Sequence, residues 1–248
     1  LSLSPDIKMA SDPFLPIFRS FRTTIMRNEI DPDFDASAPL GDYYFSAEGI
    51  RMMHTLQQSD WDVRLPRGEW EALAPLVKAR VGLAAKELTT HLGRLGGETY
   101  REVIDSGLSM LEHAYEADHG WVGFNDNWVI EFFPQLARAF PEANMLVIIR
   151  DLRAAMASAM NLRDNNPSLS SNVPLMYSFS HQWRKHSANT HVMMGDPSLR
   201  DRLRLIRYED IAADPGKEMA ELCAFLGAAY DPAMLDTDQF RPMAGDRW

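Results

Sequence analysis

The sequence contains few of the residues and patterns that mark disulfide-bonded, membrane-spanning or nucleic-acid-binding proteins. Its single cysteine, Cys223, excludes an internal disulfide and favours a reducing, cytoplasmic compartment. It has no run of about 18 apolar residues and no signal peptide, so we expect no membrane-spanning helix. Lys and Arg number 25 against 35 Asp and Glu, and a formal net charge of −10 disfavours binding to nucleic acid or anionic membranes.

Patterns typical of metal and nucleotide-kinase sites are also absent. The sequence has no HExxH motif and no paired-cysteine spacing, so we expect no metal site. Its one glycine pair, Gly96-Gly97, lies between predicted helices and follows no strand, so it cannot form a phosphate-binding loop. A nucleotide kinase would require such a loop and Mg²⁺ ligands, and the sequence supports neither.

What the sequence does contain is an ordinary globular composition, with 46% hydrophobic and 24% charged residues among 248. Apolar periodicity and capping signals predict helices, with Gly227 ending the last one, and residues 30–44 read as a polar loop. The predicted helices are 13–28, 47–58, 67–94, 99–118, 128–140, 152–163, 174–193 and 215–225. Pro134 indicates a kink or a late start in the fifth of them.

Strand patterns occur only after residue 120, at 121–124, 145–149 and 203–208. The continuous apolar run of residues 145–149 is typical of a strand buried on both faces of a parallel sheet. Strands alternating with helices predict an α/β fold in which a parallel sheet is flanked by helices in three layers. We expect one domain over 1–248, in which 30–118 form a helical insertion that covers one side.

Ligands of such sheets bind beyond the carboxyl ends of the strands, where this sequence places Asn125, Asp126, Arg150 and Tyr208. Arg150 can donate two N–H groups to a phosphate, and free N–H groups at the start of the next helix would add to the site. Ser158, on that helix, could supply a hydroxyl. The alternative is a structural ion pair between Arg150 and Asp151 or Glu209.

Two blocks of sequence resemble those of the sulfotransferases that use 3′-phosphoadenosine 5′-phosphosulfate (PAPS). Residues 140–158, Phe-Pro-Glu-Ala-Asn-Met-Leu-Val-Ile-Ile-Arg-Asp-Leu-Arg-Ala-Ala-Met-Ala-Ser, resemble the family's 3′-phosphate-binding segment. Residues 205–215 and 223–227 resemble its Tyr-Glu-Asp strand and Phe-Leu-Gly helix end, in the family's order and separation. Residues 3–8 resemble the turn after its first helix, and 240–248 its Phe-Arg-Lys-Gly…Gly-Asp-Trp loop.

The resemblance implies a P-loop nucleotide kinase-like fold and a role for each matching residue. Arg150 and Ser158 would hold the 3′-phosphate, and Tyr208 would contact the adenine. Arg241 would add a phosphate contact. The alternatives without a binding role are that Tyr208 is a core tyrosine at the end of a strand and that Arg241 is a solvated loop arginine.

The same resemblance suggests a catalytic base. The tyrosylprotein branch of the family has a glutamate seven residues after the proline of its Pro-Asp turn, and counting from Pro5 reaches Asp12. Burial beside Phe14 and Leu15 would raise the pKa of a carboxyl there, as a general base requires. Asp12 could equally be the N-cap of helix 13–28, with Pro13 at the first helical position. The segment 124–128, where other members carry a histidine, has none, and we expect His119 and His181 to be surface or core residues.

Two departures from the family pattern bear on activity. The glycine-rich loop for the 5′-phosphosulfate would precede Leu1, and the lysine usual near 125–126 is replaced by Asn125-Asp126. Because the chain begins without Met and ends on Arg247-Trp248, we expect that residues are missing at both ends.

Two functions remain open. One is a PAPS-dependent sulfotransferase that transfers a sulfuryl group to an acceptor hydroxyl and releases adenosine 3′,5′-bisphosphate, with 30–118 on the acceptor side. The other is a catalytically inactive relative whose 30–118 helices bind a partner protein. Six aromatic residues could line an apolar acceptor pocket or belong to the core: Phe14, Phe18, Phe21, Tyr43, Tyr44 and Trp61.

Overall fold

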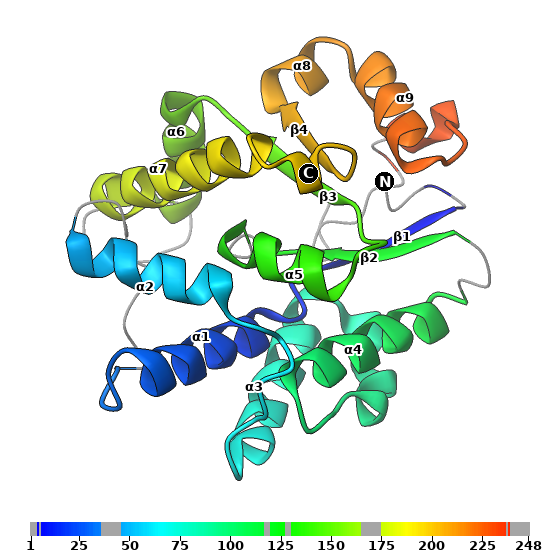
Figure 1. Ribbon diagram of the computed structural model, residues 1–248. Helices are drawn as coiled ribbons and strands as arrows, with labels where there is room; N and C mark the ends of the chain where they lie inside the picture. Colours follow the sequence, from blue (N-terminus) through cyan, green and yellow to red (C-terminus); the bar gives the residue numbers. More distant parts are fainter. Residues whose placement is uncertain are drawn as a thin grey trace.

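The computed structural model describes residues 4, 6–35, 46–116, 120–126, 130–164, 175–236 and 238. Its described strands form two parallel pairs (Figure 1). Strand β1 (Ile7–Ser11) pairs with β2 (Trp121–Asn125), with Ser11 opposite Asn125. Strand β3 (Met145–Ile149) pairs with β4 (Leu203–Arg207), with Ile149 opposite Arg207. The fold is therefore α/β, but mostly helical with small parallel sheets.

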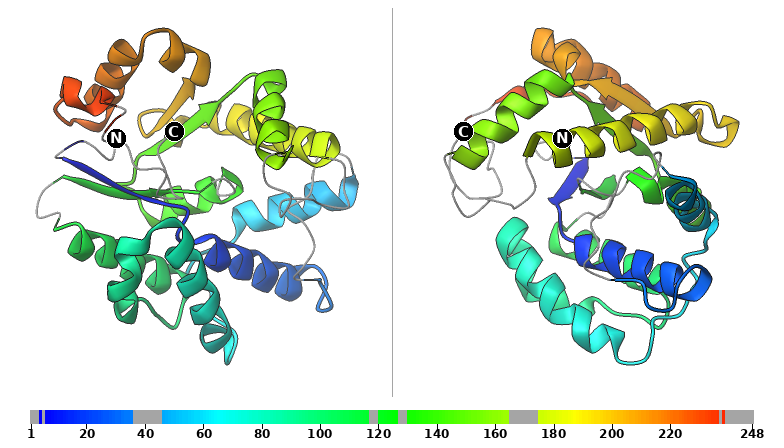
Figure 2. Two further views of the ribbon diagram at one scale, coloured as in Figure 1. Left: turned by 180° about the vertical axis from the view of Figure 1, so that it is seen from behind. Right: turned by 90° about the vertical axis from the view of Figure 1, so that its left-hand side faces the viewer.

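Helices surround the strands. In Figure 1, α1, α3 and α4 lie below the β1–β2 pair, whereas α6, α7, α8 and α9 lie above it, and the back view in Figure 2 shows the same division. The helices are α1 (Leu15–Glu29), α2 (Ala47–Gln58), α3 (Glu69–Ala84), η2 (Lys86–Arg94), α4 (Tyr100–Ala114), η3 (Ile130–Phe132), α5 (Phe133–Ala139), α6 (Leu152–Asp164), α7 (Leu175–Met194), η5 (Pro197–Leu199), α8 (Tyr208–Ala213), α9 (Pro215–Leu226) and η6 (Pro232–Leu235).

Local capping explains why most helix boundaries match the sequence prediction. The Ser46 hydroxyl accepts the N–H of Gly49 at the start of α2. Thr99 and Glu102 form a capping box at the start of α4. Gly227 ends α9 in the left-handed conformation, with φ 67°. The predicted helix 67–94 is instead broken at Ala85 into α3 and η2.

Aromatic residues of α1, together with Phe14 before it and Trp61 after α2, form the centre of the core. Phe14, Phe18, Phe21 and Trp61 are each 0% exposed, and the rings of Phe21 and Trp61 stack with centroids 4.0 Å apart. For these four residues the structure therefore supports the alternative that they belong to the core. Tyr43 and Tyr44 lie outside the described residues.

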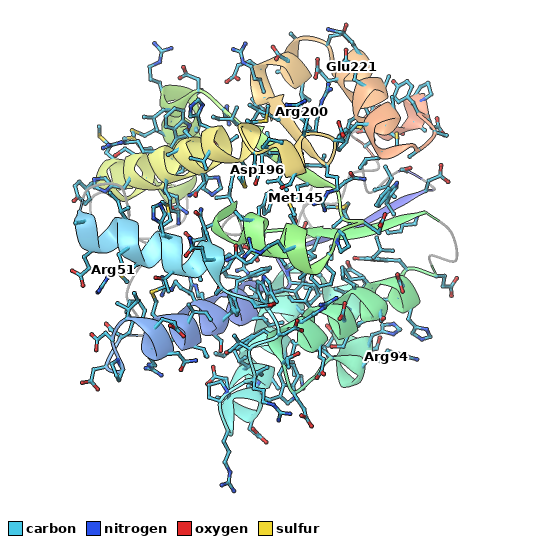
Figure 3. All side chains as sticks on the ribbon, viewed as in Figure 1. Arg51, Arg94, Met145, Asp196, Arg200 and Glu221 are labelled. Atoms are coloured by element: carbon cyan, nitrogen blue, oxygen red, sulfur yellow. The ribbon has the colours of Figure 1, made fainter. Side chains whose placement is uncertain are left out.

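The charged side chains of the outer helices contrast with this core. Figure 3 shows Arg51, Arg94 and Glu221 at the periphery, whereas Met145, at the start of β3, lies in the interior and is 6% exposed. These charged side chains thus lie on the outside of the helices, and the apolar start of β3 lies inside.

The sheet differs from the prediction in two respects. Among the described residues, the four strands do not form one hydrogen-bonded sheet but two separate pairs. The two pairs nevertheless lie next to one another in every view (Figures 1 and 2) and share apolar packing, for example Ile7 of β1 with Ile206 of β4. Ile148 of β3 is 59% exposed, so the prediction that this strand is buried on both faces is also wrong.

Strand β1 is an element that the sequence did not predict. Residues 3–8 resembled a turn, but the strand begins at Ile7 and runs through Lys8 and Met9 to Ser11. Only Ile7 and Ala10 of its five residues are buried, so the strand lacks a regular apolar alternation. Pairing with β2 stabilises a segment that its own sequence specifies weakly.

Candidate functional site

The carboxyl ends of β3 and β4 bring Arg150 and Tyr208 together. Because Ile149 lies opposite Arg207, the residues that follow them are neighbours. The guanidinium carbon of Arg150 lies 4.3 Å from the centre of the Tyr208 ring, a cation–π geometry. Tyr208 begins α8 and is 42% exposed, so the alternative of a core tyrosine is wrong.

Arg150 has no carboxylate partner among the described residues, so the alternative of a structural ion pair is not supported. Asp151 pairs with Arg153 at 2.9 Å, and Glu209 accepts the backbone N–H of Asp151 at 2.8 Å. The Nε of Arg150 is buried and bonds to no described residue. A half-buried guanidinium without a counter-charge is suited to binding an anion.

A tryptophan fixes the backbone beneath this guanidinium. The indole Nε1 of Trp183, on α7, donates to the carbonyl oxygen of Arg150 at 2.8 Å. The long helix α7 thus holds the point at which β3 ends. The sequence analysis did not identify Trp183, because its position on an amphipathic helix does not reveal a contact to a residue 33 positions earlier.

The start of α6 differs from the prediction of free N–H groups. The Asp151 carboxylate accepts the N–H groups of Arg153 at 2.9 Å and Ala154 at 3.3 Å. The bond from the Arg153 side chain, followed by that from the Ala154 N–H, lowers the pKa of Asp151 to about 2. The backbone N–H of Asp151 likewise lowers the pKa of Glu209. Protein carboxylates therefore occupy these N–H groups, and an anion here would be bound mainly by side chains.

Ser158 and Arg241 complete the predicted donor site. Ser158 lies on α6, seven residues after Asp151. The Ser158 side chain is exposed, and its hydroxyl makes no hydrogen bond with the described residues. Arg241 lies outside the described residues, so its role stays a prediction.

Asp12 follows β1 and is not the N-cap of the first helix. Helix α1 begins at Leu15 and its cap, Phe14, makes no side-chain hydrogen bond, so the capping alternative and the placement of Pro13 inside the helix are wrong. The backbone N–H of Asp12 instead donates to the carbonyl of Asn125 at 2.7 Å, next to the end of β2. Asp12 is 4% exposed.

The partner of the Asp12 carboxylate is Arg80, which the sequence analysis missed. The Arg80 guanidinium forms an ion pair with Oδ2 of Asp12, and its Nε donates to the Asp12 carbonyl at 3.0 Å. Burial favours a neutral carboxyl, whereas a contacting guanidinium favours the ionised form. No sequence pattern links the two residues, which are 68 positions apart.

Other predicted groups lie elsewhere. His181 is on α7 with its ring 4.1 Å from that of Tyr177, and His119 is outside the described residues. A surface groove of about 620 Å³ lies between α3 and η2 and contains none of the predicted site residues. Its lining residues include Trp70, Pro75, Lys78, Leu92 and Leu95.

A comparison with family models decides the family. The model described as the sulfotransferase family matches residues 44–232, which is more than half of the chain. The chain belongs to the sulfotransferase family. The matched range of this sulfotransferase-family protein contains Arg150, Ser158, Tyr208 and Arg80, whereas Asp12 precedes it.

Two solved structures are similar to this family member. The sulfotransferase domain from the curacin biosynthetic pathway is 18% identical, with a TM-score of 0.43 over 99% of this chain and 80% of that one. The sulfotransferase domain from the Synechococcus PCC 7002 olefin synthase is 15% identical, with a TM-score of 0.45 over 97% and 79%. No curated protein matches the sequence.

Two further findings concern only the part of the chain that the structure describes. No helix there is both long and apolar enough to cross a membrane. No group of three or more His, Cys, Asp or Glu side chains there is arranged to hold a metal ion.

Proposed function

We propose that this family member transfers a sulfuryl group from PAPS to an acceptor hydroxyl and releases adenosine 3′,5′-bisphosphate. The observation that carries the proposal is the Arg150 guanidinium, which stacks on Tyr208 at the end of β3 and contacts no carboxylate in the described chain. In a chain of net charge −10, such a cation is suited to an anionic ligand.

The donor side of the site follows from this arrangement. Arg150 donates its N–H groups to the 3′-phosphate, and Ser158 adds a hydroxyl from α6. The exposed ring of Tyr208 offers an apolar surface to the adenine, and Arg241 adds a further phosphate contact. The proposal includes a nucleotide kinase-like arrangement of the strands and helices, and the two parallel strand pairs of the α/β fold support it.

The acceptor side is proposed to contain the base. Asp12 takes the proton of the acceptor hydroxyl while the oxygen attacks sulfur in line. The new O–S bond forms as the bond from sulfur to the bisphosphate oxygen breaks, and the leaving phosphate carries the electron pair away. Residues 30–118, of which α2, α3, η2 and α4 are described, cover the acceptor side of this single domain.

The second candidate is a catalytically inactive relative whose 30–118 helices bind a partner protein. Asn125, the last residue of β2, and the adjacent Asp126 favour this candidate. A sulfotransferase would need a cation at this position to stabilise charge on the transferred group, and neither residue supplies one. The two functions differ in sulfuryl transfer, which only the enzyme performs.

The decisive experiment is a calorimetric titration of adenosine 3′,5′-bisphosphate into the chain and its Arg150→Ala variant. Charge-assisted hydrogen bonds contribute about 1.5–3 kcal/mol, so we expect binding to weaken about tenfold or more. Arg200→Ala, a change of the same type at an exposed arginine of the outer surface (Figure 3), should bind like the wild type.

Adenosine 5′-monophosphate, which lacks the 3′-phosphate, sharpens the assignment. Its affinity should be the same for Arg150→Ala and the wild type, because the arginine is proposed to read the phosphate that this ligand lacks. Equal affinities of the two proteins for the bisphosphate would refute the site. Tight bisphosphate binding without transfer of labelled sulfate from PAPS would favour the inactive relative.

A further inference from the structure

Asp12 occupies an unusual backbone position at the end of β1. Its φ is 53°, the left-handed region that residues other than glycine seldom adopt, although aspartate tolerates it better than most. The bond from its N–H to the Asn125 carbonyl extends the β1–β2 pairing by one residue. This geometry turns the chain sharply between the strand and α1.

Arg80 contacts both the backbone and the side chain of this residue. Its Nε donates to the Asp12 carbonyl at 3.0 Å, while a terminal nitrogen forms the ion pair with Oδ2. Val77 and Val81, on the same helix, are 1% and 0% exposed, so α3 is anchored in the core on both sides of Arg80. The Arg80 guanidinium therefore extends to Asp12 from a helix whose position is fixed by core packing.

The other carboxylate oxygen of Asp12 is left without a partner. Oδ1 is buried and accepts no hydrogen bond from the described residues, although Oδ2 of the same group is paired. Buried carboxylate oxygens ordinarily accept a hydrogen bond, so an oxygen without a donor among the described residues indicates a place for a donor from a ligand. An acceptor hydroxyl is a donor of that kind.

We propose that Arg80 is the positioning residue of the Asp12 base. It holds Oδ2 and the carbonyl so that Oδ1 stays available for the proton of the acceptor hydroxyl. The inference rests on the proposed function, and it adds a specific role for α3, because this helix carries the residue that orients the base. Arg80 contacts the acceptor only through Asp12.

A measurement that needs no acceptor tests the positioning itself. In the chain labelled with ¹³C at aspartate carboxyls, the Asp12 signal is the one that disappears in Asp12→Asn. Arg80→Gln should shift that signal at constant pH, because the contacting guanidinium is lost. Lys78→Gln removes the same charge from an exposed position on the same helix and should leave the signal in place. An Asp12 signal unchanged by Arg80→Gln would overturn the proposal.

A kinetic measurement tests the consequence, with PAPS as donor and 4-nitrophenol as acceptor probe. Arg80→Gln should lower kcat at least about tenfold, leave the KM for PAPS within about twofold and leave bisphosphate binding unchanged. Arg80→Lys should recover part of kcat, and a thermal melt of each variant checks its folding. Lys78→Gln should match the wild type.

A double variant separates positioning from a direct role. If Arg80 acts through Asp12, Arg80→Gln should lower kcat no further in a chain that already carries Asp12→Asn. An additive decrease would contradict the inference, as would full activity of Arg80→Gln alone. A wild-type chain that neither binds the bisphosphate nor transfers sulfate would instead contradict the proposed function, and the carboxyl signal would still decide the contact.

Discussion

The two strand pairs end in opposite electrostatic arrangements. At the end of β3 and β4, the Arg150 cation lies against the exposed Tyr208 ring and no described carboxylate neutralises it. At the end of β1, the Asp12 anion is buried and Arg80 neutralises it from α3. At one end the cation is partly exposed beside an aromatic ring, whereas at the other end the anion is buried and paired with a cation.

In the proposed function, donor binding and proton transfer use these two ends separately. A guanidinium can bind a phosphate wherever its N–H groups are accessible. The local sequence places such a guanidinium at the end of a strand. A general base must be held in one orientation, and here Arg80 of the distant helix α3 holds Asp12. Donor recognition and proton transfer would then depend on different parts of the chain, and variants should affect them separately.

The largest effect is expected at a buried ion pair of α7, the helix that also supports Arg150. Lys185 of α7 and Glu131 of η3 form a fully buried ion pair at 2.9 Å, and α7 also holds the Arg150 backbone through Trp183. Removing one partner leaves a buried charge uncompensated, so Lys185→Met should lower the free energy of unfolding by about 3–5 kcal/mol. Urea denaturation measures this loss.

The double variant Lys185→Met with Glu131→Leu is the matched control for that prediction. Replacing both charges with apolar groups removes the uncompensated charge, so much of the stability should return. A single variant as stable as the wild type would contradict the prediction that removing one partner leaves a costly buried charge.

A smaller effect is expected where α7 supports Arg150. Trp183→Phe keeps an aromatic ring but removes the hydrogen bond to the Arg150 carbonyl. Because one such bond contributes about 0.5–1.5 kcal/mol, bisphosphate affinity should fall roughly twofold to tenfold. The Asp12 carboxyl signal should not move, so a shift there would break the separation between the two ends.

The smallest effect concerns the cap of α6 and its dependence on pH. The pKa of Asp151 is lowered from 3.8 to about 2 in the folded chain. A carboxyl with a depressed pKa stabilises the fold above its unfolded value, and that stabilisation is lost as pH falls through the folded value. The Asp151→Asn variant should therefore have a lower melting temperature than the wild type at neutral pH. The difference in melting temperature should disappear between about pH 4 and pH 2.

Thermal melts of both proteins across that range provide the measurement. The effect should be small, because Asp151 is solvent-exposed and water screens its interactions. A gap that stays constant down to pH 2 would show that the carboxylate charge does not contribute to the cap.

Much of the fold could be predicted because its signals are local. Capping residues such as Ser46, Thr99 and Gly227 interact within a few positions, so their sequence spacing fixes the helix ends. The proximity of Arg150 and Tyr208 also followed, because parallel strands align their carboxyl ends.

Other features could not be predicted because they depend on partners far away in sequence. Strand β1 has too few buried residues to show a strand pattern and forms against β2, more than a hundred positions later. The N–H groups at the start of α6 looked available to an anion, but Asp151 and Glu209 already occupy three of them.

The sequence by itself determined most of the helices, the apolar strand that ends at Arg150, the net charge of −10 and the resemblance that the family match confirmed. These depend on residue type and short-range spacing, which a sequence displays directly. Only the tertiary structure decided that Arg80 holds Asp12 and that no carboxylate of the described residues pairs with Arg150. The packing of whole helices brings such partners together. Because the partners are far apart in sequence, their contact produces no periodic pattern of residues that a sequence could reveal.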